Sequence, residues 1–290
     1  MELHQISKHC YYSDPLKKGD QPVMGLIAGP CETLAVDCGN GPGRSLWLLQ
    51  QAKKLDLPPV RYAVLTHWHW DHVMGGRAMQ ETGVTLLATQ GTARQLEVMS
   101  GWQWSNEAIA ARVADGLEIP FCQEAILEEY PREPRSLDSP LPDITINGDG
   151  ACVHLDDVTV QLIPCPCDHS MDGMLVRVPE DGVVFVGDSL YLNMYQSPWH
   201  YTGEKLLPLL DTLEGMEADW YLPAHHDKPM TGAELRSFAA RQRELCRLVG
   251  EDVTLQGPAR RYAAAFGQEP DAEAVEELMA FVRGNIVQGR

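Results

Sequence analysis

The sequence predicts an α/β fold in which two strand-rich halves form a four-layer αββα sandwich, with a helical insertion and additional C-terminal helices. Three observations favour this fold class. Short apolar runs alternate with helical patterns up to residue 89, runs typical of strands return from residue 143, and helical patterns flank both halves. We expect residues 1–232, with an insertion at 91–140, to form one domain, and a helical segment at 233–290 to pack on it.

The first half is expected to alternate strands with helices. Apolar spacing predicts a helix over 43–57, which ends before Pro58 and Pro59, and a short helix over 75–83. Apolar runs bounded by turn residues predict strands at 22–29, 32–39, 60–67 and 84–89. Within 91–140, helical patterns are followed by a proline-rich, charged stretch, which indicates an insertion or lid rather than a separate domain.

The second half is expected to contain antiparallel hairpins, because its strand-like runs follow one another closely with turn residues between them. These runs lie at 143–148, 152–157, 158–164, 173–180 and 182–188. A helix is predicted over 203–217, and a strand over 218–226. Three helical patterns follow, at 233–250, 257–267 and 271–287.

Composition limits the classes of partner. The 290 residues include 41 acidic and 23 basic side chains, giving a net charge of −18. This charge disfavours extended contacts with nucleic acid or with an anionic membrane surface, both of which select Lys and Arg. There is neither an apolar run of about 20 residues nor a recognisable targeting segment, so we expect a cytoplasmic protein with reduced cysteines. The pair Cys165 and Cys167 is a weak metal signal, and burial as small side chains is the alternative.

The segment THWHWDH at 66–72 concentrates metal-ligand side chains at the end of a predicted strand. In an extended segment alternate side chains face the same way, so His67 and His69 can share one ion. Asp71 and His72 lie further along the chain and could reach a second ion. A single histidine would be better explained as a surface residue, but four ligand-type residues after an apolar strand favour a metal site.

Further candidate ligands follow other predicted strands. His169, Asp188 and His225 each stand at or just after the end of a short apolar run. Functional residues are often presented in this way, on loops held by a rigid scaffold. His226 competes with His225, and the sequence does not separate these neighbours.

Five motifs in order, AVDCG, THWHWDH, DHS, FVGDSL and LPAH, resemble those of the metallo-β-lactamase-fold hydrolases. The resemblance covers roughly residues 20–230. It implies that Asp188 bridges two metals together with a water or hydroxide, and that Asp37 orients the site from outside the ligand set. It implies one metal at His67, His69 and His169, and a second at Asp71, His72 and His225.

The subfamily implied by the resemblance is nearer to glyoxalase II-like, lactonase-like and phosphodiesterase-like hydrolases than to β-lactamases. Exported β-lactamases usually lack the equivalent of His72, and many carry Cys in place of Asp188. Electron-transferring diiron members replace the second histidine by Glu, whereas this chain has His69. Basic residues expected to hold glutathione are missing after Asp188, where Tyr191 resembles the tyrosine that binds the substrate carbonyl in lactonases. The alternative is that Tyr191 and the nearby Tyr195 are packing residues.

The long separation between His72 and His169 is accounted for by the insertion. Trp102 and Trp104 within it are candidates for an apolar wall above the metals; core packing or dimer contact is the alternative. A lid of this kind favours a small organic substrate over a polymer.

The sequence thus predicts a binuclear metal-dependent hydrolase that uses a metal-bridging hydroxide on a small ester, thioester or lactone. Asp71, Asp188 and Tyr191 are the candidate catalytic residues. Two divalent ions are expected, with zinc favoured and iron or manganese also compatible with imidazole and carboxylate ligands. The alternatives are a phosphodiesterase for small substrates, a mononuclear iron enzyme resembling persulfide dioxygenases, and a non-catalytic metal-binding protein. The C-terminal helices either cover the sandwich or form a homodimer contact.

Overall fold

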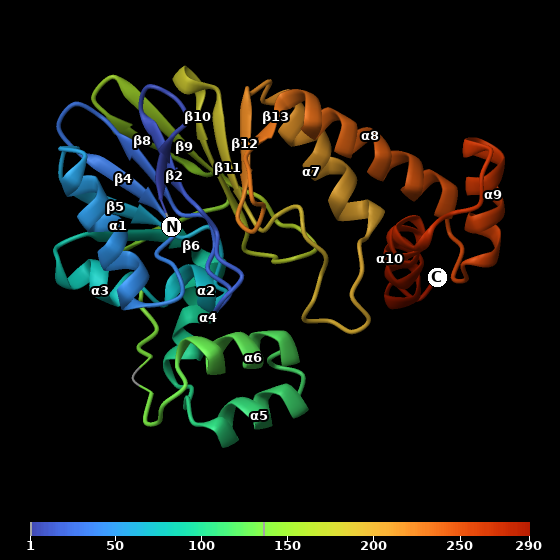
Figure 1. Cartoon of the computed structure of the whole chain (residues 1–290), viewed down its shortest axis with the longest axis horizontal. Helices are drawn as coiled ribbons and strands as arrows, with labels where there is room; N and C mark the ends of the chain where they lie inside the picture. Colours follow the sequence, from blue (N-terminus) through green and yellow to red (C-terminus); the bar gives the residue numbers. More distant parts are fainter. Residues whose placement is uncertain (1, 136) are drawn as a thin grey trace.

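Two β-sheets flanked by helices form the body of the protein in a computed structural model, which describes residues 2–135 and 137–290 (Figure 1). Ser136, inside the predicted insertion, and Met1 lie outside the described residues. The helices lie on the outer sides of the paired sheets, as expected for a four-layer αββα sandwich. Among the described residues, every helix is too short or too polar to cross a membrane.

The first sheet is antiparallel at one side and parallel at the other. Strands β1 to β4 pair antiparallel, and β4 to β7 pair parallel. The strands follow sequence order: β1 (Leu3–Gln5), β2 (Cys10–Ser13), β3 (Gly25–Ala28), β4 (Thr33–Val36), β5 (Val60–Val64), β6 (Thr85–Thr89) and β7 (Ile144–Ile146).

The second sheet is largely antiparallel, but β11 and β12 pair parallel because helix α7 connects them. A short 3-10 helix, η1 (Pro179–Asp181), lies between β10 and β11. From one edge to the other the strands are β13 (Met230–Thr231), β12 (Trp220–Pro223), β11 (Val183–Gly187), β10 (Met174–Val178), β9 (Val158–Pro164) and β8 (Ala151–Leu155).

The sheets share a buried apolar layer that holds them face to face. Ile27 and Leu34 of the first sheet and Val176 of the second belong to one buried cluster. The contact is close at Gly25 of β3, where an added Cβ would lie 2.3 Å from the ring of Phe185 in β11. A larger residue at this position would therefore have to displace the Phe185 ring or the sheet that carries it.

Helices on the outer faces complete two further buried clusters. The first sheet is accompanied by α1 (Pro42–Lys54), α2 (Trp70–Val73) and α3 (Gly76–Glu81). The second is covered by α7 (Gly203–Gly215) and α8 (Gly232–Val249), and α9 (Gln256–Phe266) and α10 (Ala272–Val287) pack against α8. Tyr262 and Leu278 from the C-terminal helices share a buried cluster with Val184 of β11, so these helices contribute to the same core.

The insertion is helical, as expected. It contains α4 (Gln90–Ser100), α5 (Asn106–Ala114) and α6 (Pro120–Glu129), and the last two project from the sandwich (Figure 1). The Thr89 and Ser105 side chains accept hydrogen bonds from Thr92 N and Ala108 N, which satisfies amides at the starts of α4 and α5.

Some details of the sequence prediction were wrong or incomplete. The strand near 143–148 was grouped with the antiparallel second half, but β7 pairs parallel with β6 in the first sheet, because the insertion brings the chain back to that edge. The short strands β1, β2 and β13 were missed. Part of the 66–72 segment, expected to be extended or a loop, forms the helical turn α2, which changes the direction of Asp71 and His72.

Candidate metal centre

The candidate ligands follow strands whose carboxyl ends lie at one edge of the sandwich. Strand β10 pairs antiparallel with both β9 and β11, and β12 is parallel to β11, so β9, β11 and β12 run in the same direction. His169, Asp188 and His225 follow these three strands. The 66–72 segment follows β5 and meets the second sheet where Met174 N donates to Thr66 O at 2.8 Å. Both sheets therefore supply side chains to one site.

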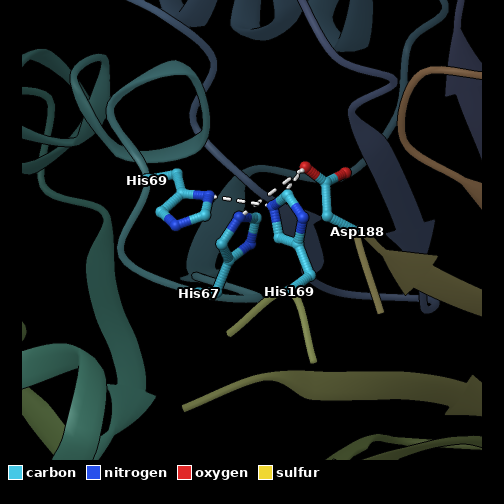
Figure 2. Close-up of side chains that lie close together, drawn as sticks. All are labelled: His67, His69, His169 and Asp188. Atoms are coloured by element: carbon cyan, nitrogen blue, oxygen red, sulfur yellow. Dashed lines mark hydrogen bonds and ion pairs between the residues drawn. The ribbon is translucent and has the colours of Figure 1, made fainter. Parts of the chain in front are cut away.

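One group of four side chains converges from three loops (Figure 2). His169 Nε2 lies 2.9 Å from His69 Nδ1 and 3.2 Å from Asp188 Oδ2, and His67 Nε2 lies 3.8 Å from the same carboxylate oxygen. One ligand atom from each of these residues lies within 4.8 Å of the others, an arrangement that could hold a metal ion.

A second group shares Asp188 with the first. Asp71 Oδ2 lies 3.1 Å from His72 Nε2 and 3.2 Å from His225 Nε2. Asp188 Oδ2 lies 3.4 Å from His72 Nε2 and 3.5 Å from His225 Nε2. These four residues also have ligand atoms within 4.8 Å of one another. Asp188 thus lies between two adjacent positions, each suited to a divalent cation.

Apart from their close contacts with one another, several buried ligand atoms make no hydrogen bond to the described residues. They are His67 Nε2, Asp71 Oδ2, His72 Nε2 and Asp188 Oδ1. Buried polar atoms in native proteins are almost always paired. A cation at these positions would satisfy the facing lone pairs, so the donor set fits metal binding.

Hydrogen bonds behind the histidines fix which nitrogen faces the site. The Leu192 carbonyl can only accept, so His169 Nδ1 donates to it at 3.0 Å and leaves Nε2 with a lone pair. Likewise His72 Nδ1 donates to the Asp37 carboxylate at 2.8 Å. Such partners orient metal-ligating imidazoles.

Asp37 links three parts of the site and adopts a left-handed backbone with φ of 60°. Its carboxylate accepts from Thr66 N at 2.7 Å and from Thr66 Oγ1 at 2.9 Å, as well as from His72. It therefore occupies the orienting position that the family resemblance implied, behind the ligands.

Burial and neighbouring charges divide the histidines into two classes. Burial, reinforced by neighbouring imidazoles, holds the pKa of His67 and His69 well below the usual value, so both are neutral. Burial opposes charge on His72 and His225 as well, but the nearby Asp71 and Asp188 carboxylates outweigh it and raise their pKa. A cation would take over the stabilisation of these carboxylates and displace those protons.

A cavity of about 190 Å³ adjoins the ligands. Besides the ligands, the cavity is lined by apolar side chains of the insertion and of the loop after β11: Ile119, Phe121, Cys122, Met194 and Tyr195. Asp20 and Tyr191 also line it. The Tyr191 hydroxyl accepts a hydrogen bond from His225 N at 3.2 Å.

The tryptophans of the insertion follow the packing alternative. Trp102 and Trp104 are not among the residues lining this cavity; Trp104 belongs to a buried apolar cluster, against which Trp102 packs. Their rings lie against the Arg112 guanidinium, at 4.5 and 4.8 Å, and Trp104 is buried. Trp68 packs against Trp102 and Tyr195, and Trp70 is buried in the core. The two tryptophans of the 66–72 segment therefore anchor that segment.

Other expectations are resolved by position. His225 faces the carboxylates, whereas His226 is not part of either ligand group. Cys165 and Cys167 are buried in an apolar cluster and are not members of these groups. Asp20 was missed, because nothing in its local sequence distinguishes it from an ordinary turn residue. Burial, followed by the effect of Asp71, raises its pKa to about 7.

A family model described as the metallo-beta-lactamase superfamily matches residues 18–225. The chain belongs to this superfamily. Members of the metallo-beta-lactamase superfamily are mostly metal-dependent hydrolases. All seven candidate ligands lie within the matched range, and α8, α9 and α10 lie outside it.

Solved structures support the same fold. A metallo-beta-lactamase from Pontibacter korlensis is 18% identical, with a TM-score of 0.57 over 82% of this chain and 97% of that one. DIM-1 metallo-beta-lactamase exposed to ceftazidime is 16% identical, with a TM-score of 0.55 over 82% and 94%. VMB-1 at pH 5.5 is 15% identical, with a TM-score of 0.57 over 82% and 94%. At these identities the likeness shows the fold alone. No curated protein matches the sequence.

The close approach of two backbone segments behind His72 can be tested at Gly75. An added Cβ would lie 2.1 Å from Cys38 O, so Gly75→Ala should lower the free energy of unfolding by about 1–3 kcal/mol. Gly43→Ala in α1 is the matched control, because its Cβ would meet nothing within 4 Å, and stability should be unchanged or rise by about 0.5–1 kcal/mol. Urea unfolding measures both, and equal midpoints would contradict the packing argument.

Proposed function

We propose that the chain is a hydrolase that uses two divalent metal ions, with zinc favoured, to cleave an ester, thioester or lactone bond in a small molecule. The observation that carries this proposal is the position of Asp188, whose Oδ2 atom faces both ligand groups. His67, His69 and His169 would hold one ion. Asp71, His72 and His225 would hold the other.

Bound at these positions, the ions would supply water activated as a nucleophile at neutral pH and would polarise the substrate carbonyl. The chain's own residues supply the remaining requirements. Asp188 would orient the nucleophile between the two positions. The Tyr191 hydroxyl accepts from His225 N and still has its own proton, which it can donate to the carbonyl oxygen of a substrate in the cavity.

The cavity supports a small, partly apolar substrate. Ile119, Phe121 and Met194 offer an apolar surface in the same cavity as the ligands, and the volume of about 190 Å³ suits a small molecule rather than a polymer. With a net charge of −18 as well, we propose that neither nucleic acid nor a membrane surface is the natural ligand. A small phosphodiester is the second candidate, because Lys17 lines an adjoining cavity and could contact a phosphate.

Metal content tests the proposal directly. The purified protein should bind about two transition-metal ions per chain, and their removal by a chelator should abolish hydrolysis, which returns on adding zinc. A panel of thioesters, lactones, phosphodiesters and a β-lactam identifies the bond cleaved. Failure to bind metal after reconstitution would overturn the assignment. Iron binding with sulfur-dependent oxygen uptake would instead support the persulfide dioxygenase alternative.

The neighbours His225 and His226 provide a matched pair. His225→Ala should lower kcat/KM by more than about 100-fold and remove one ion, since losing even an indirect partner of a metal ligand costs about 10–100-fold. His226→Ala should retain both ions and most of the activity, because this side chain is outside the two ligand groups. Equal losses in the two variants would contradict the ligand assignment.

Tyr191→Phe keeps the ring and removes only the hydroxyl. We expect kcat to fall by about 10²-fold with little change in metal content, as for removal of a donor to a developing oxyanion. Tyr195→Phe is the control. The hydroxyl that it removes donates to Glu118 at 3.1 Å and is therefore engaged in a hydrogen bond within the protein, so kcat should fall much less. Steady-state kinetics on the best substrate of the panel, with metal analysis of each variant, makes the comparison; an unchanged kcat in Tyr191→Phe excludes the catalytic role.

A further inference from the structure

His225 has a carboxylate behind it as well as in front of it. Its Nε2 faces Asp71 and Asp188, while its Nδ1 lies 3.4 Å from Asp20 Oδ1. Asp20 comes from the loop between β2 and β3, far from the ligand motifs in the sequence. Its side chain is only 16% exposed, although aspartate is usually found at the surface. It is not a member of either ligand group, so its contact with the site is made through His225.

The backbone at Asp20 is strained, with φ of 48° in the left-handed region. A non-glycine residue there persists only when surrounding contacts hold it, and such residues cluster at functional sites. Three hydrogen bonds hold the adjacent residues. Asn40 Nδ2 donates to Gly19 O at 2.7 Å, Gly19 N donates to Glu128 Oε2 at 3.0 Å, and Gln21 Nε2 donates to Glu129 Oε2 at 3.3 Å. Helix α6 of the insertion thus clamps the loop on both sides of Asp20.

A further contact fixes this loop relative to His225. Val23 N donates to Ala224 O at 2.7 Å, which ties the end of the Asp20 loop to the residue just before His225. Ala224 N in turn donates to Gly187 O at 3.0 Å, next to Asp188. These backbone contacts hold the Asp20 loop close to the loop that carries His225.

We propose that Asp20 is a positioning residue that holds His225 in the orientation required of a ligand to the second metal position. The inference rests on the proposed function, because it concerns the metal site described there. A carboxylate behind an imidazole selects the tautomer that presents its other nitrogen to the metal and makes that nitrogen a stronger donor. Asp20 stands behind His225 as Asp37 stands behind His72, although the contact of 3.4 Å with His225 is longer than the 2.8 Å hydrogen bond with His72.

The two metal positions consequently differ. Both histidines of the second position, His72 and His225, face a carboxylate on the side away from the ion. In the first position, His169 is backed by the neutral Leu192 carbonyl and His67 by the Thr66 hydroxyl, at 3.0 and 3.1 Å. Loss of Asp20 should therefore weaken one position selectively.

The test compares Asp20→Gly with Asp20→Asn, because Gly and Asn both tolerate the left-handed backbone. The two stepwise dissociation constants for Zn²⁺ are measured by competition with a chromophoric chelator, and Co²⁺ spectra report the geometry of each position. In Asp20→Gly the ion at the second position should bind about 10–100-fold more weakly, and the affinity of the first position should be unchanged. Asp20→Asn keeps an oxygen acceptor facing His225 and should restore part of the affinity.

Asp227→Asn is the matched control, since Asp227 lines the adjoining cavity and its removal changes the charge of the protein by the same amount. It should leave both constants unchanged. The inference is overturned if the Asp20 variants bind both ions as tightly as the unchanged protein, or if both positions weaken equally. The inference stands if metal affinity falls at the second position alone. Absence of cleavage of every substrate tested would count against the proposed function but not against this inference. Failure of the unchanged protein to bind any metal overturns both.

Discussion

The burial of Asp188 among four histidines and a second carboxylate is the constraint on which the rest of the site depends. A carboxylate taken from water into a protein interior is strongly destabilised unless opposite charge or hydrogen bonds compensate. Here its Oδ1 has no hydrogen-bond partner among the described residues, and its Oδ2 faces four imidazole nitrogens that come from three segments of the chain. A bound cation would compensate the charge of this buried carboxylate, and the surrounding loops place further ligand side chains around the same point.

The ligand side chains meet at one edge of the sandwich because of the direction in which the strands run. Because β9, β11 and β12 run the same way, the residues that follow them meet at one edge, and β5 brings the 66–72 segment there from the other sheet. The backbone contact between Met174 and Thr66 joins the two sheets at that edge. Trp70 then anchors the segment in the core of the first sheet, so the histidines are held by packing as well as by their polar partners.

The sequence was most informative where a local pattern carries the chemistry. Spacing and strand ends were enough to predict the fold class and to predict that His67 and His69 lie together. The insertion was predicted from its helical pattern, but its contact with the site was not, because which face of α6 lines the cavity depends on how the insertion packs. Trp102 and Trp104 show the same limit: aromatic residues can pack on Arg112 as well as they can line a pocket. The contact of Asp20 with the site could not be predicted from the sequence. It depends on a left-handed turn and on contacts of its loop with α6, and no short motif indicates either.

Helix α6 contributes both to the cavity wall and to the hydrogen bonds that hold the Asp20 loop, and different side chains make the two sets of contacts. Phe121 near its start lines the cavity, whereas Glu128 and Glu129 at its end hold Gly19 and Gln21. Under the proposed function, the start of the helix can vary with the substrate, while its end is constrained by the Asp20 loop that it holds. Exchanging the whole insertion would therefore alter the cavity wall and the support of the Asp20 loop together, whereas a substitution at Phe121 would alter the cavity wall alone.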